Sequence, residues 1–341
     1  MGATGDIGRT VFQQLLAAGT VPAGIVINAY RLESAALRNK TAAEISRNFG
    51  PEGERVVLDN IKLTRKALKV GSAEIPVFTP DSQHEIFQEG HPVIDATGKH
   101  KKRELLEPML AAGAKFVLVT SPVSAEEGIQ TIVYGVNDDD TKFTKALQDG
   151  MLSTSSCTTT AVTSFLMPIL SKKDETDLSG ILVDVKHART KSNSPMEIAN
   201  NIEVTSSGGI KEIPKILNIK PDQLVFNLQC IRANVACGSL ASITLLFGPK
   251  LRTDNLGSLK AGIVNALKDS GSIYRIDSDI KDVKNVVGKK ESAVINLDRM
   301  TFHKMPGGES VATNIDVYYD NVTGYTRSAL DSYKAMVAAI T

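Results

Sequence analysis

Tryptophan is absent from this 341-residue chain, and aromatic residues make up only 5% of it. An excess of one charge is lacking too, because 39 Lys and Arg face 38 Asp and Glu, which leaves a formal net charge of +1. A nearly neutral chain offers no electrostatic basis for binding nucleic acid or an anionic membrane surface. No uninterrupted apolar run approaches the roughly 18 residues that a membrane-spanning helix needs. We therefore expect a cytoplasmic protein that binds neither nucleic acid nor membranes.

Cysteine is scarce, with only Cys157, Cys230 and Cys237 in the chain. An odd count in a long chain disfavours a disulfide framework. Cys230 and Cys237 have no C-x-x-C spacing and no nearby histidine pair, so core packing is favoured over a metal site. The N-terminus lacks the apolar stretch of a secretory signal. These features predict a protein of a reducing compartment, without a bound metal.

Apolar runs are short but regular, and hydrophobic residues reach 42%, which is enough to form cores. At about 150 residues per domain, the length suggests two domains. In the first 150 residues strand-like runs alternate with helical patterns, which predicts a doubly wound parallel sheet. After Ser153 the strands have little helix between them, which predicts an α+β unit with a mainly antiparallel sheet. The runs expected as strands are 23–28, 92–97, 115–120 and 132–136 in the first part, and 180–187, 223–231, 239–247 and 311–319 in the second.

Three glycines open the chain, because Gly2, Gly5 and Gly8 form a G-x-x-G-x-x-G turn ahead of a helical pattern. Glycines there let the backbone approach a pyrophosphate, whose charge then lies at the helix N-terminus. Together with the strand–helix rhythm, the turn predicts a dinucleotide-binding domain of the Rossmann type. Such a turn normally follows a strand, and Met1 leaves no room for one. Either the chain begins after its natural start, or the sheet lacks its central first strand.

The acidic residue that normally binds the adenine ribose about 20 residues further on is missing. Asn28, Ala29, Tyr30 and Arg31 occupy the end of the second strand instead. An arginine at this point suits a 2′-phosphate, so NADP is favoured over NAD as the cofactor. The alternative is that Arg31 is simply solvated.

Hydroxyl residues surround Cys157 in the segment 153–160, just before a helix-spaced apolar run. Serine and threonine are helix N-caps, so Cys157 is expected in the first turn of a helix. There the macrodipole and the free N–H groups favour the thiolate, the reactive form of cysteine. On this observation alone, a nucleophile and an inert buried cysteine both remain open. Pro168 is expected to kink this helix or to end it early.

The segment 153–160 resembles the active-site segment of the phosphorylating glyceraldehyde-3-phosphate dehydrogenases, in which a catalytic Cys follows Ser and precedes two Thr. The similarity extends over nearly the whole chain, and six or more short matches in the family's order identify the chain as a divergent member. The matches are Ala96-Thr97-Gly98, Gly113-Ala114-Lys115, Thr120-Ser121-Pro122, Gly135-Val136-Asn137, Asn201-Ile202, Ser206-Ser207-Gly208-Gly209, Arg232, and Tyr319-Asp320-Asn321 with Gly324-Tyr325.

The resemblance also implies a mechanism and its residues. Cys157 would attack an aldehyde carbonyl, while His187 would take the proton and lower the thiol pKa. Hydride would pass to the nicotinamide, and inorganic phosphate would open the resulting thioester to an acyl phosphate. Two anion pockets, for the substrate phosphate and the attacking phosphate, would be formed by Ser156, Thr158, Thr190, Ser192, Ser207, Gly208 and Arg232. The cofactor would be held by Gly5, Asp6, Ile7, Arg31, Thr97, Gly98, Thr120 and Asn321, the last of which would bind the nicotinamide carboxamide.

The identity of the base is open between two neighbouring residues. An ungapped count from Gly180 puts Lys186 at the base position, whereas one inserted residue restores His187. We prefer His187, because Thr190 and Ser192 then align as well. A lysine would be a poor base at neutral pH unless it were desolvated.

We therefore expect an NAD(P)-dependent, phosphorylating aldehyde dehydrogenase that acts on a small anionic aldehyde and forms a homo-oligomer, either a tetramer or a dimer. Two alternatives remain. One is an NADPH-dependent reduction of an acyl phosphate or semialdehyde, which the Gly-Ala-Thr-Gly opening favours. The other is a non-catalytic homologue that binds metabolites or partners. The expected domains are residues 1–156 for the dinucleotide and 157–320 for catalysis, with the C-terminal helix 321–341 packing back onto the first domain.

Overall fold

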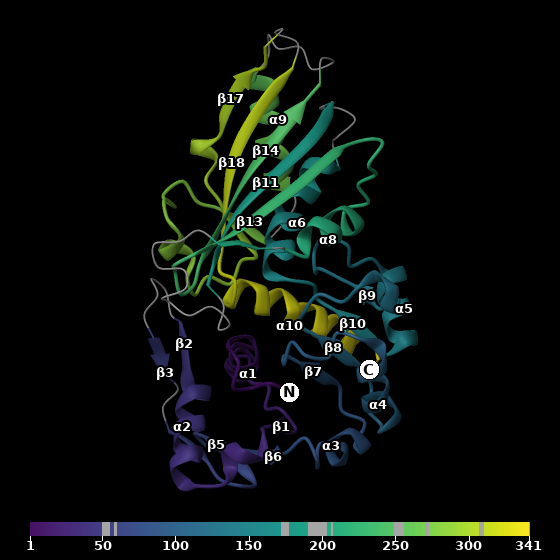
Figure 1. The fold of residues 1–341 in the computed structure, drawn as a ribbon, viewed down its shortest axis with the longest axis vertical. Helices are drawn as coiled ribbons and strands as arrows, with labels where there is room; N and C mark the ends of the chain where they lie inside the picture. The colour runs from purple at the N-terminus through teal and green to yellow at the C-terminus, as the bar shows by residue number, and fades with distance from the viewer. Residues whose placement is uncertain are drawn as a thin grey trace.

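The computed structural model describes residues 1–49, 55–57, 60–171, 177–189, 203–205, 207–248, 256–269, 273–306 and 310–340. Figure 1 shows a tall, twisted sheet in the upper half and an α/β half below it, with helix α10 (Thr323–Ala338) running along their boundary. The N-terminus lies in the lower half, and the C-terminal helix returns to it. Among the described helices, none has the length and apolar content that crossing a bilayer requires.

Four parallel strands form one sheet of the lower half, in the order β7-β8-β10-β9. All residues of β8 and β10 are buried, as is typical of a parallel sheet with both faces covered. The carboxyl ends of the strands share one edge, and ligands of open α/β sheets bind at that edge. The strands are β7 (Val93–Asp95), β8 (Val117–Val119), β10 (Met151–Ser153) and β9 (Gln130–Thr131), and the connecting helices are α4 (Arg103–Ala111) and α5 (Asp140–Asp149).

A second sheet of the lower half has the order β1-β6-β5-β4, with β1 parallel to β6 and the other neighbours antiparallel. It packs with α2 around a core that includes Ile45, Leu68 and Ile75, all fully buried. The elements are β1 (Ile25–Val26), β6 (Ala73–Phe78), β5 (Ala67–Val70) and β4 (Ile61–Leu63), with α1 (Asp6–Ala17), α2 (Ala35–Ser46), α3 (His84–Gln88) and the two-stranded ribbon β2 (Arg47–Phe49) and β3 (Arg55–Val57).

The two sheets of the lower half are not continuous, because no described strand joins β1 to β7. Met1 takes one position of such a strand. Its ammonium donates to the Ile94 carbonyl at 2.7 Å, and the Ala96 N–H donates to the Met1 carbonyl at 3.1 Å, as in a parallel bridge. Beside it, a cavity of about 330 Å³ is lined by α1, β1 and β7. The glycine turn thus opens α1 next to an interruption of the parallel sheet.

Helix α10 packs onto the lower half. Tyr333 and Met336 join the cluster around Phe116 and Leu118 of the parallel sheet, and the Gln14 amide donates to the Thr323 carbonyl at 3.1 Å. The helix therefore contacts both α1 and the β8 region, as expected for the C-terminal segment. The domain boundaries at 156 and 320 stay a prediction.

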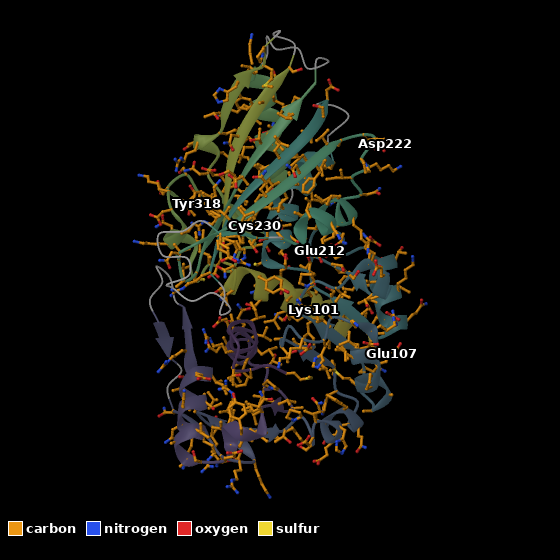
Figure 2. The ribbon with its side chains drawn as sticks, viewed as in Figure 1. Lys101, Glu107, Glu212, Asp222, Cys230 and Tyr318 are labelled. Carbon is orange, nitrogen blue, oxygen red and sulfur yellow. The ribbon has the colours of Figure 1, made fainter. Side chains whose placement is uncertain are left out.

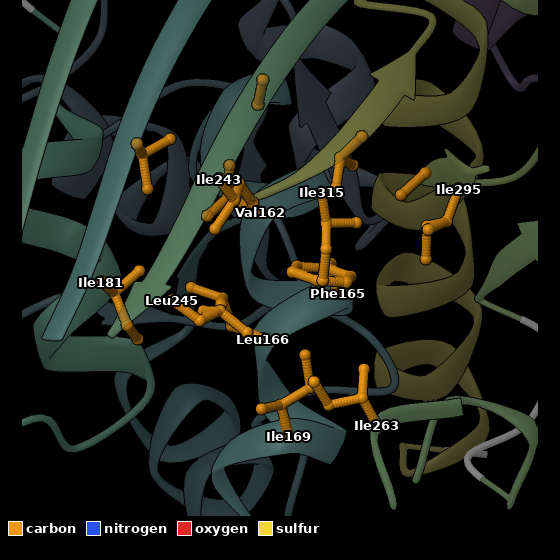
Figure 3. Packing of buried hydrophobic residues seen from close by; sticks show 14 of the residues in the cluster. Val162, Phe165, Leu166, Ile169, Ile181, Ile243, Leu245, Ile263, Ile295 and Ile315 are labelled. Carbon is orange, nitrogen blue, oxygen red and sulfur yellow. The ribbon is translucent and has the colours of Figure 1, made fainter. Parts of the chain in front are cut away.

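The upper half is a mixed eight-stranded sheet in the order β12-β13-β11-β14-β18-β16-β15, with β17 paired to β18. Most neighbours are antiparallel, and only β11–β13 and β15–β16 run parallel. Helix α6 lies against the sheet, where Val162, Phe165 and Leu166 pack with Ile243 and Leu245 (Figure 3). The strands are β12 (Glu203–Thr205), β13 (Val225–Ala233), β11 (Leu178–Ala188), β14 (Ser239–Phe247), β18 (Val311–Tyr319), β16 (Ala293–Ile295), β15 (Tyr274–Ile276) and β17 (Thr301–Lys304), and the helices are α6 (Cys157–Leu170), α8 (Gly209–Ile216) and α9 (Leu256–Asp269).

Candidate active site

Cys157 is the first residue of α6, directly beyond the carboxyl end of β10. Ser156 is the N-cap, and its hydroxyl accepts from the Thr159 N–H at 3.2 Å, as the hydroxyl-rich sequence predicts. Ser155 has a left-handed backbone with φ +64°, which costs free energy for a residue with a Cβ. The turn is held by its neighbours, because Ser153 Oγ accepts from the Ser155 N–H at 3.1 Å and the Tyr325 hydroxyl donates to the Ser155 carbonyl at 3.0 Å. This sharp corner directs Cys157 out of the parallel sheet.

The structure brings Cys157 and His187 together. The distance from Cys157 Sγ to His187 Nε2 is 3.2 Å, and the His187 side chain is buried. Successive side chains of a strand point to opposite faces, so Lys186 on β11 faces away, where its ammonium pairs with Asp184 at 2.6 Å. Of the two base candidates, only His187 lies beside the thiol.

Arg232 lies next to His187 on the adjacent strand β13, at the same register position. Its Nη1 is 2.6 Å from His187 Nδ1 and 3.1 Å from the Ala188 carbonyl, and that carbonyl is also 2.6 Å from Nδ1. If Nδ1 accepts from Arg232, the ring proton is on Nε2 and faces the sulfur. If Nδ1 donates to Ala188, Nε2 is free to accept the thiol proton. Arg232 therefore influences which ring nitrogen of His187 carries the proton, and with it whether His187 can accept the proton of Cys157.

The sequence predicts a thiolate at Cys157, but the pKa values of Cys157 and His187 indicate that the pair is not ionised. Burial raises the pKa of the Cys157 thiol to about 11, although the Thr158 N–H and hydroxyl and the charge of Arg232 act in the opposite direction. Burial, together with the charge of Arg232, also lowers the pKa of His187 to about 4, against the hydrogen bond to the Ala188 carbonyl. The expectation of a thiolate is wrong for this state, because desolvation outweighs the helix N-terminus. At neutral pH the pair is a thiol beside a neutral imidazole.

This ionisation predicts a steep pH dependence of alkylation. Because the pKa of Cys157 is about 11, the thiolate fraction rises about tenfold for each pH unit between 7 and 10, and the thiolate is the form that reacts. The second-order rate of iodoacetamide labelling at Cys157, followed by peptide mass spectrometry, should therefore rise without a plateau up to pH 10. A Cys157→Ser variant gives the background from Cys230 and Cys237. A plateau near pH 7 would show instead a stabilised thiolate.

The predicted anion-binding residues lie on three elements near the thiol. Ser156 and Thr158 begin α6, Arg232 lies on β13, and Ser207 and Gly208 precede α8. The Thr158 hydroxyl is 2.9 Å from the Tyr319 hydroxyl, while Ser207 Oγ accepts from the Gly209 N–H at 3.2 Å. A Cβ on Gly208 would lie 3.9 Å from the Pro122 ring, in ordinary contact. Thr190 and Ser192 lie outside the described residues.

The glycine turn has the geometry that close backbone approach requires. The Gly5 N–H donates to the Gly2 carbonyl at 2.9 Å, and α1 begins at the next residue, Asp6. A Cβ on Gly8 would lie 2.1 Å from the Gly2 carbonyl oxygen, so no larger residue fits there. Gly2 itself has φ +80°, a conformation that favours glycine. The turn and the N-terminus of α1 fit a dinucleotide pyrophosphate.

Most of the other residues predicted to bind the cofactor already make hydrogen bonds or ion pairs within the protein. Arg31 Nη1 pairs with Glu44 at 2.5 Å, so its charge is already matched. The Thr97 hydroxyl donates to Asp95 at 3.1 Å, and the Thr120 hydroxyl donates to the Asp95 carbonyl at 3.3 Å. The Asn321 carbonyl oxygen accepts from the Gly238 N–H at 2.9 Å, which fixes the orientation of the amide. Three predicted cofactor residues remain. Gly98 has a left-handed backbone with φ +67°. Asp6 forms an ion pair with Arg9, and Ile7 packs against Val322.

Three further residues contact the site without having been assigned a role from the sequence, although Tyr319 and Tyr325 belong to segments that resemble the family. Tyr319 and Tyr325 bond Thr158 and Ser155, respectively, and they reach the site from the far end of the chain. Glu212, on α8, accepts from the Ser155 hydroxyl at 2.7 Å and from the Thr159 hydroxyl at 3.0 Å. The sequence did contain a pattern that could have indicated Glu212, because this residue falls at the helical spacing of the buried residues Gly209, Ile213 and Ile216 of α8.

The fold and site define a class of protein, one that joins a Rossmann domain to an α+β domain with a mainly antiparallel sheet and holds a cysteine at the seam. Sequence comparison agrees with this class. No protein-family model matches the chain. Glyceraldehyde-3-phosphate dehydrogenase of Streptomyces coelicolor is 27% identical over 360 aligned residues, covering 96% of this chain and 94% of that protein. The enzyme of Thermotoga maritima is 26% identical over 292 residues, covering 81% and 82%, and glyceraldehyde-3-phosphate dehydrogenase 1 of Bacillus subtilis is 23% identical, covering 96% and 94%. Over most of its length the chain is thus similar to glyceraldehyde-3-phosphate dehydrogenases, as a divergent relative of them.

Proposed function

We propose that the chain is an NAD(P)-dependent dehydrogenase that oxidises a small phosphorylated aldehyde to an acyl phosphate through a thioester on Cys157. The observation that carries the proposal is the 3.2 Å contact between Cys157 Sγ and His187 Nε2, with Arg232 against the same imidazole. A nucleophile within hydrogen-bond reach of a base, with a third group orienting the base, is the arrangement of covalent catalysis. The relatives' names favour oxidation of a phosphorylated aldehyde over other chemistries.

The residues divide the work as follows. Cys157 attacks the aldehyde carbon, and His187 accepts the thiol proton at Nε2. This requires Nδ1 to carry the other ring proton and to donate a hydrogen bond to the Ala188 carbonyl, 2.6 Å away. When Arg232 binds an oxygen of the anionic substrate, it no longer donates to Nδ1, so substrate binding favours the tautomer that acts as the base. Addition gives a thiohemiacetal, and loss of hydride from its carbon to the bound nicotinamide would leave a thioester on Cys157. Inorganic phosphate would then attack the thioester carbon, the C–S bond would break, and Cys157 would leave as the thiolate.

The glycine turn of Gly2, Gly5 and Gly8 would hold the cofactor pyrophosphate at the start of α1. When bound, the nicotinamide supplies the hydride acceptor. Asn321 would orient its carboxamide through Nδ2, since Oδ1 is bonded to Gly238. Arg31 is paired with Glu44, and we leave NAD and NADP as equal candidates. In this proposal, residues 1–156 with helix 321–341 form the cofactor half, residues 157–320 form the catalytic half, and the protein is a cytoplasmic homo-oligomer.

The test is a titration of the purified protein with NAD and NADP separately, followed by a panel of aldehyde phosphates with inorganic phosphate. We expect micromolar binding of at least one cofactor and phosphate-dependent reduction of that cofactor with at least one aldehyde. A panel run with acyl phosphates and the reduced cofactor reveals whether the reverse reaction is faster. Binding of neither cofactor would contradict the proposal and favour a non-catalytic homologue.

A further inference from the structure

Ser239 is a buried residue beside the site that has no part in the proposed steps. It is the first residue of β14, has no exposed surface, and its hydroxyl oxygen accepts from the Ala188 N–H at 3.0 Å. Ala188 follows His187 on β11, and its carbonyl is 2.6 Å from His187 Nδ1. Ser239 therefore holds the backbone against which the imidazole is oriented.

The same hydroxyl reaches the opposite side of the site through Tyr319. Ser239 and Tyr319 are paired residues of β14 and β18, and the Ser239 hydroxyl hydrogen-bonds the Tyr319 phenol. The phenol oxygen is 2.9 Å from the Thr158 hydroxyl, which in turn hydrogen-bonds the Cys157 sulfur. The buried hydroxyls of Ser239, Tyr319 and Thr158, which we call the hydroxyl row, thus connect the Ala188 peptide to the thiol.

The single proton of each hydroxyl fixes the direction of the hydroxyl row. A thiolate sulfur can only accept, so Thr158 donates to Cys157 once the thiol has lost its proton. Thr158 then has no proton left for Tyr319, and Tyr319 donates to it. By the same reasoning Ser239 donates to Tyr319, while its oxygen accepts from the Ala188 N–H. Every bond points toward the sulfur, and hydrogen bonds aligned in this way strengthen one another in a buried site.

Tyr319 also contacts the base. Its ring meets the His187 imidazole edge-on, with the ring centroids 6.4 Å apart and an interplanar angle of 74°. Tyr318, the preceding residue, lies at the lower end of the upper sheet (Figure 2), and its hydroxyl donates to the Lys281 carbonyl at 3.4 Å. Because successive side chains of a strand point to opposite faces, only Tyr319 of these two tyrosines faces the site.

We propose that Ser239 is a positioning residue that stabilises the Cys157 thiolate through the hydroxyl row. Its bond to the Ala188 N–H also fixes the strand on which His187 is oriented. The thiol proton still passes to His187 Nε2, since the hydroxyl row keeps its own protons and only donates hydrogen bonds. The proposal rests on the proposed function, in which the sulfur of Cys157 attacks the aldehyde.

The test uses Ser239→Ala and Tyr319→Phe, each of which removes one hydroxyl and little volume. Ser242→Ala and Tyr318→Phe are the matched controls on the same two strands. The Ser242 hydroxyl donates to Asp316 at 2.8 Å, and it lies on the face of β14 opposite Ser239. Circular dichroism and thermal unfolding establish that the variants are folded. If Ser239→Ala does not fold, Ser239→Cys replaces it with the same expectation, because a thiol is a weak donor and acceptor.

The measurement is the rate of iodoacetamide labelling at Cys157 between pH 8 and 10, followed by peptide mass spectrometry without cofactor or aldehyde. Ser239→Ala should be labelled about tenfold more slowly at each pH, the effect of raising the thiol pKa by about one unit. Tyr319→Phe should lose about as much. The double variant should lose no more than either single one, because both substitutions interrupt the same hydroxyl row. The two controls should match the unchanged chain.

A merely structural role of Ser239 would have the opposite sign, because a loosened site exposes the thiol and speeds labelling. Unchanged or faster labelling of Ser239→Ala would therefore overturn the proposal, as would losses that add in the double variant. The outcome for the proposed function is separate, since labelling needs no substrate. If no aldehyde is oxidised but labelling slows as expected, the proposed function fails while the role of Ser239 stands.

Discussion

Replacing Cys157 with serine should lower aldehyde oxidation by at least about 10⁴-fold, because removal of a covalent nucleophile removes the reaction path itself. A serine hydroxyl has nearly the size of the thiol, so the N-terminus of α6 should keep its fold. The loss would therefore appear in kcat, measured by cofactor reduction at saturating aldehyde, while the affinity for cofactor stays the same.

Cys230→Ser is the control for this prediction. Cys230 is buried on β13, where it packs in the hydrophobic core, and its Sγ makes a long hydrogen bond to the Ile231 carbonyl, at 3.9 Å. Its replacement should leave kcat within about twofold, as expected for a substitution outside the reacting groups. Normal turnover by Cys157→Ser would refute the covalent mechanism.

His187→Asn should lower kcat by about 10³-fold, within the range for loss of a positioned general base. Asparagine retains a polar group on β11 but cannot accept the thiol proton. Steady-state kinetics across pH 6–10 measures the effect. Because hydroxide can replace the base, the deficit should shrink as pH rises toward the pKa of about 11 for Cys157. If the loss of kcat in His187→Asn did not change with pH, the role of His187 would be structural and not that of a general base.

Lys186→Asn is the matched control, one residue away on the same strand. The Lys186 ammonium is paired with Asp184 on the face opposite His187, so its replacement should leave kcat and the pH profile unchanged. A large loss in Lys186→Asn, with little loss in His187→Asn, would reverse the assignment of the base.

The four long strands of the upper sheet could be predicted, because each is long enough to show a hydrophobic pattern of its own. The runs at 180–187, 223–231, 239–247 and 311–319 correspond to β11, β13, β14 and β18. Alternating burial along β14 reflects the period of two that a half-covered strand requires. These segments needed no knowledge of their neighbours to be recognised.

The parallel sheet β7-β8-β10-β9 of the lower half was harder to predict, because its strands have only two or three residues each. The strand expected at 132–136 is wrong, since β9 (Gln130–Thr131) precedes it and residues 134–136 form a turn. Strand β10 was not expected, because Met151 to Ser153 is too short to show a period. Pro168 does not end α6 early, since the helix continues to Leu170. A proline two residues from the helix end disturbs only the last turn, and Phe165 and Leu166 anchor the helix in the core.

The chemistry of the site was predictable in its residue types but not in its charges. The hydroxyl cluster indicated a capped helix, and the resemblance indicated His187 and Arg232, which the structure places beside the thiol. The raised pKa of Cys157 could not be predicted, because it depends on burial by distant segments. Tyr319, which bonds the first turn of α6, is 161 positions away from its partner Thr158. Pairings of this kind arise only from the tertiary fold.

Trapping the acyl-enzyme would decide whether Cys157 is the nucleophile. The protein is mixed with a substrate aldehyde and oxidised cofactor in the absence of phosphate, quenched in acid within one turnover and digested for peptide mass spectrometry. We expect the mass of the acyl group on the peptide that contains Cys157, and its loss when phosphate is added before the quench. An acyl group on Cys230 or Cys237, or turnover without an adduct on residue 157, would contradict the mechanism.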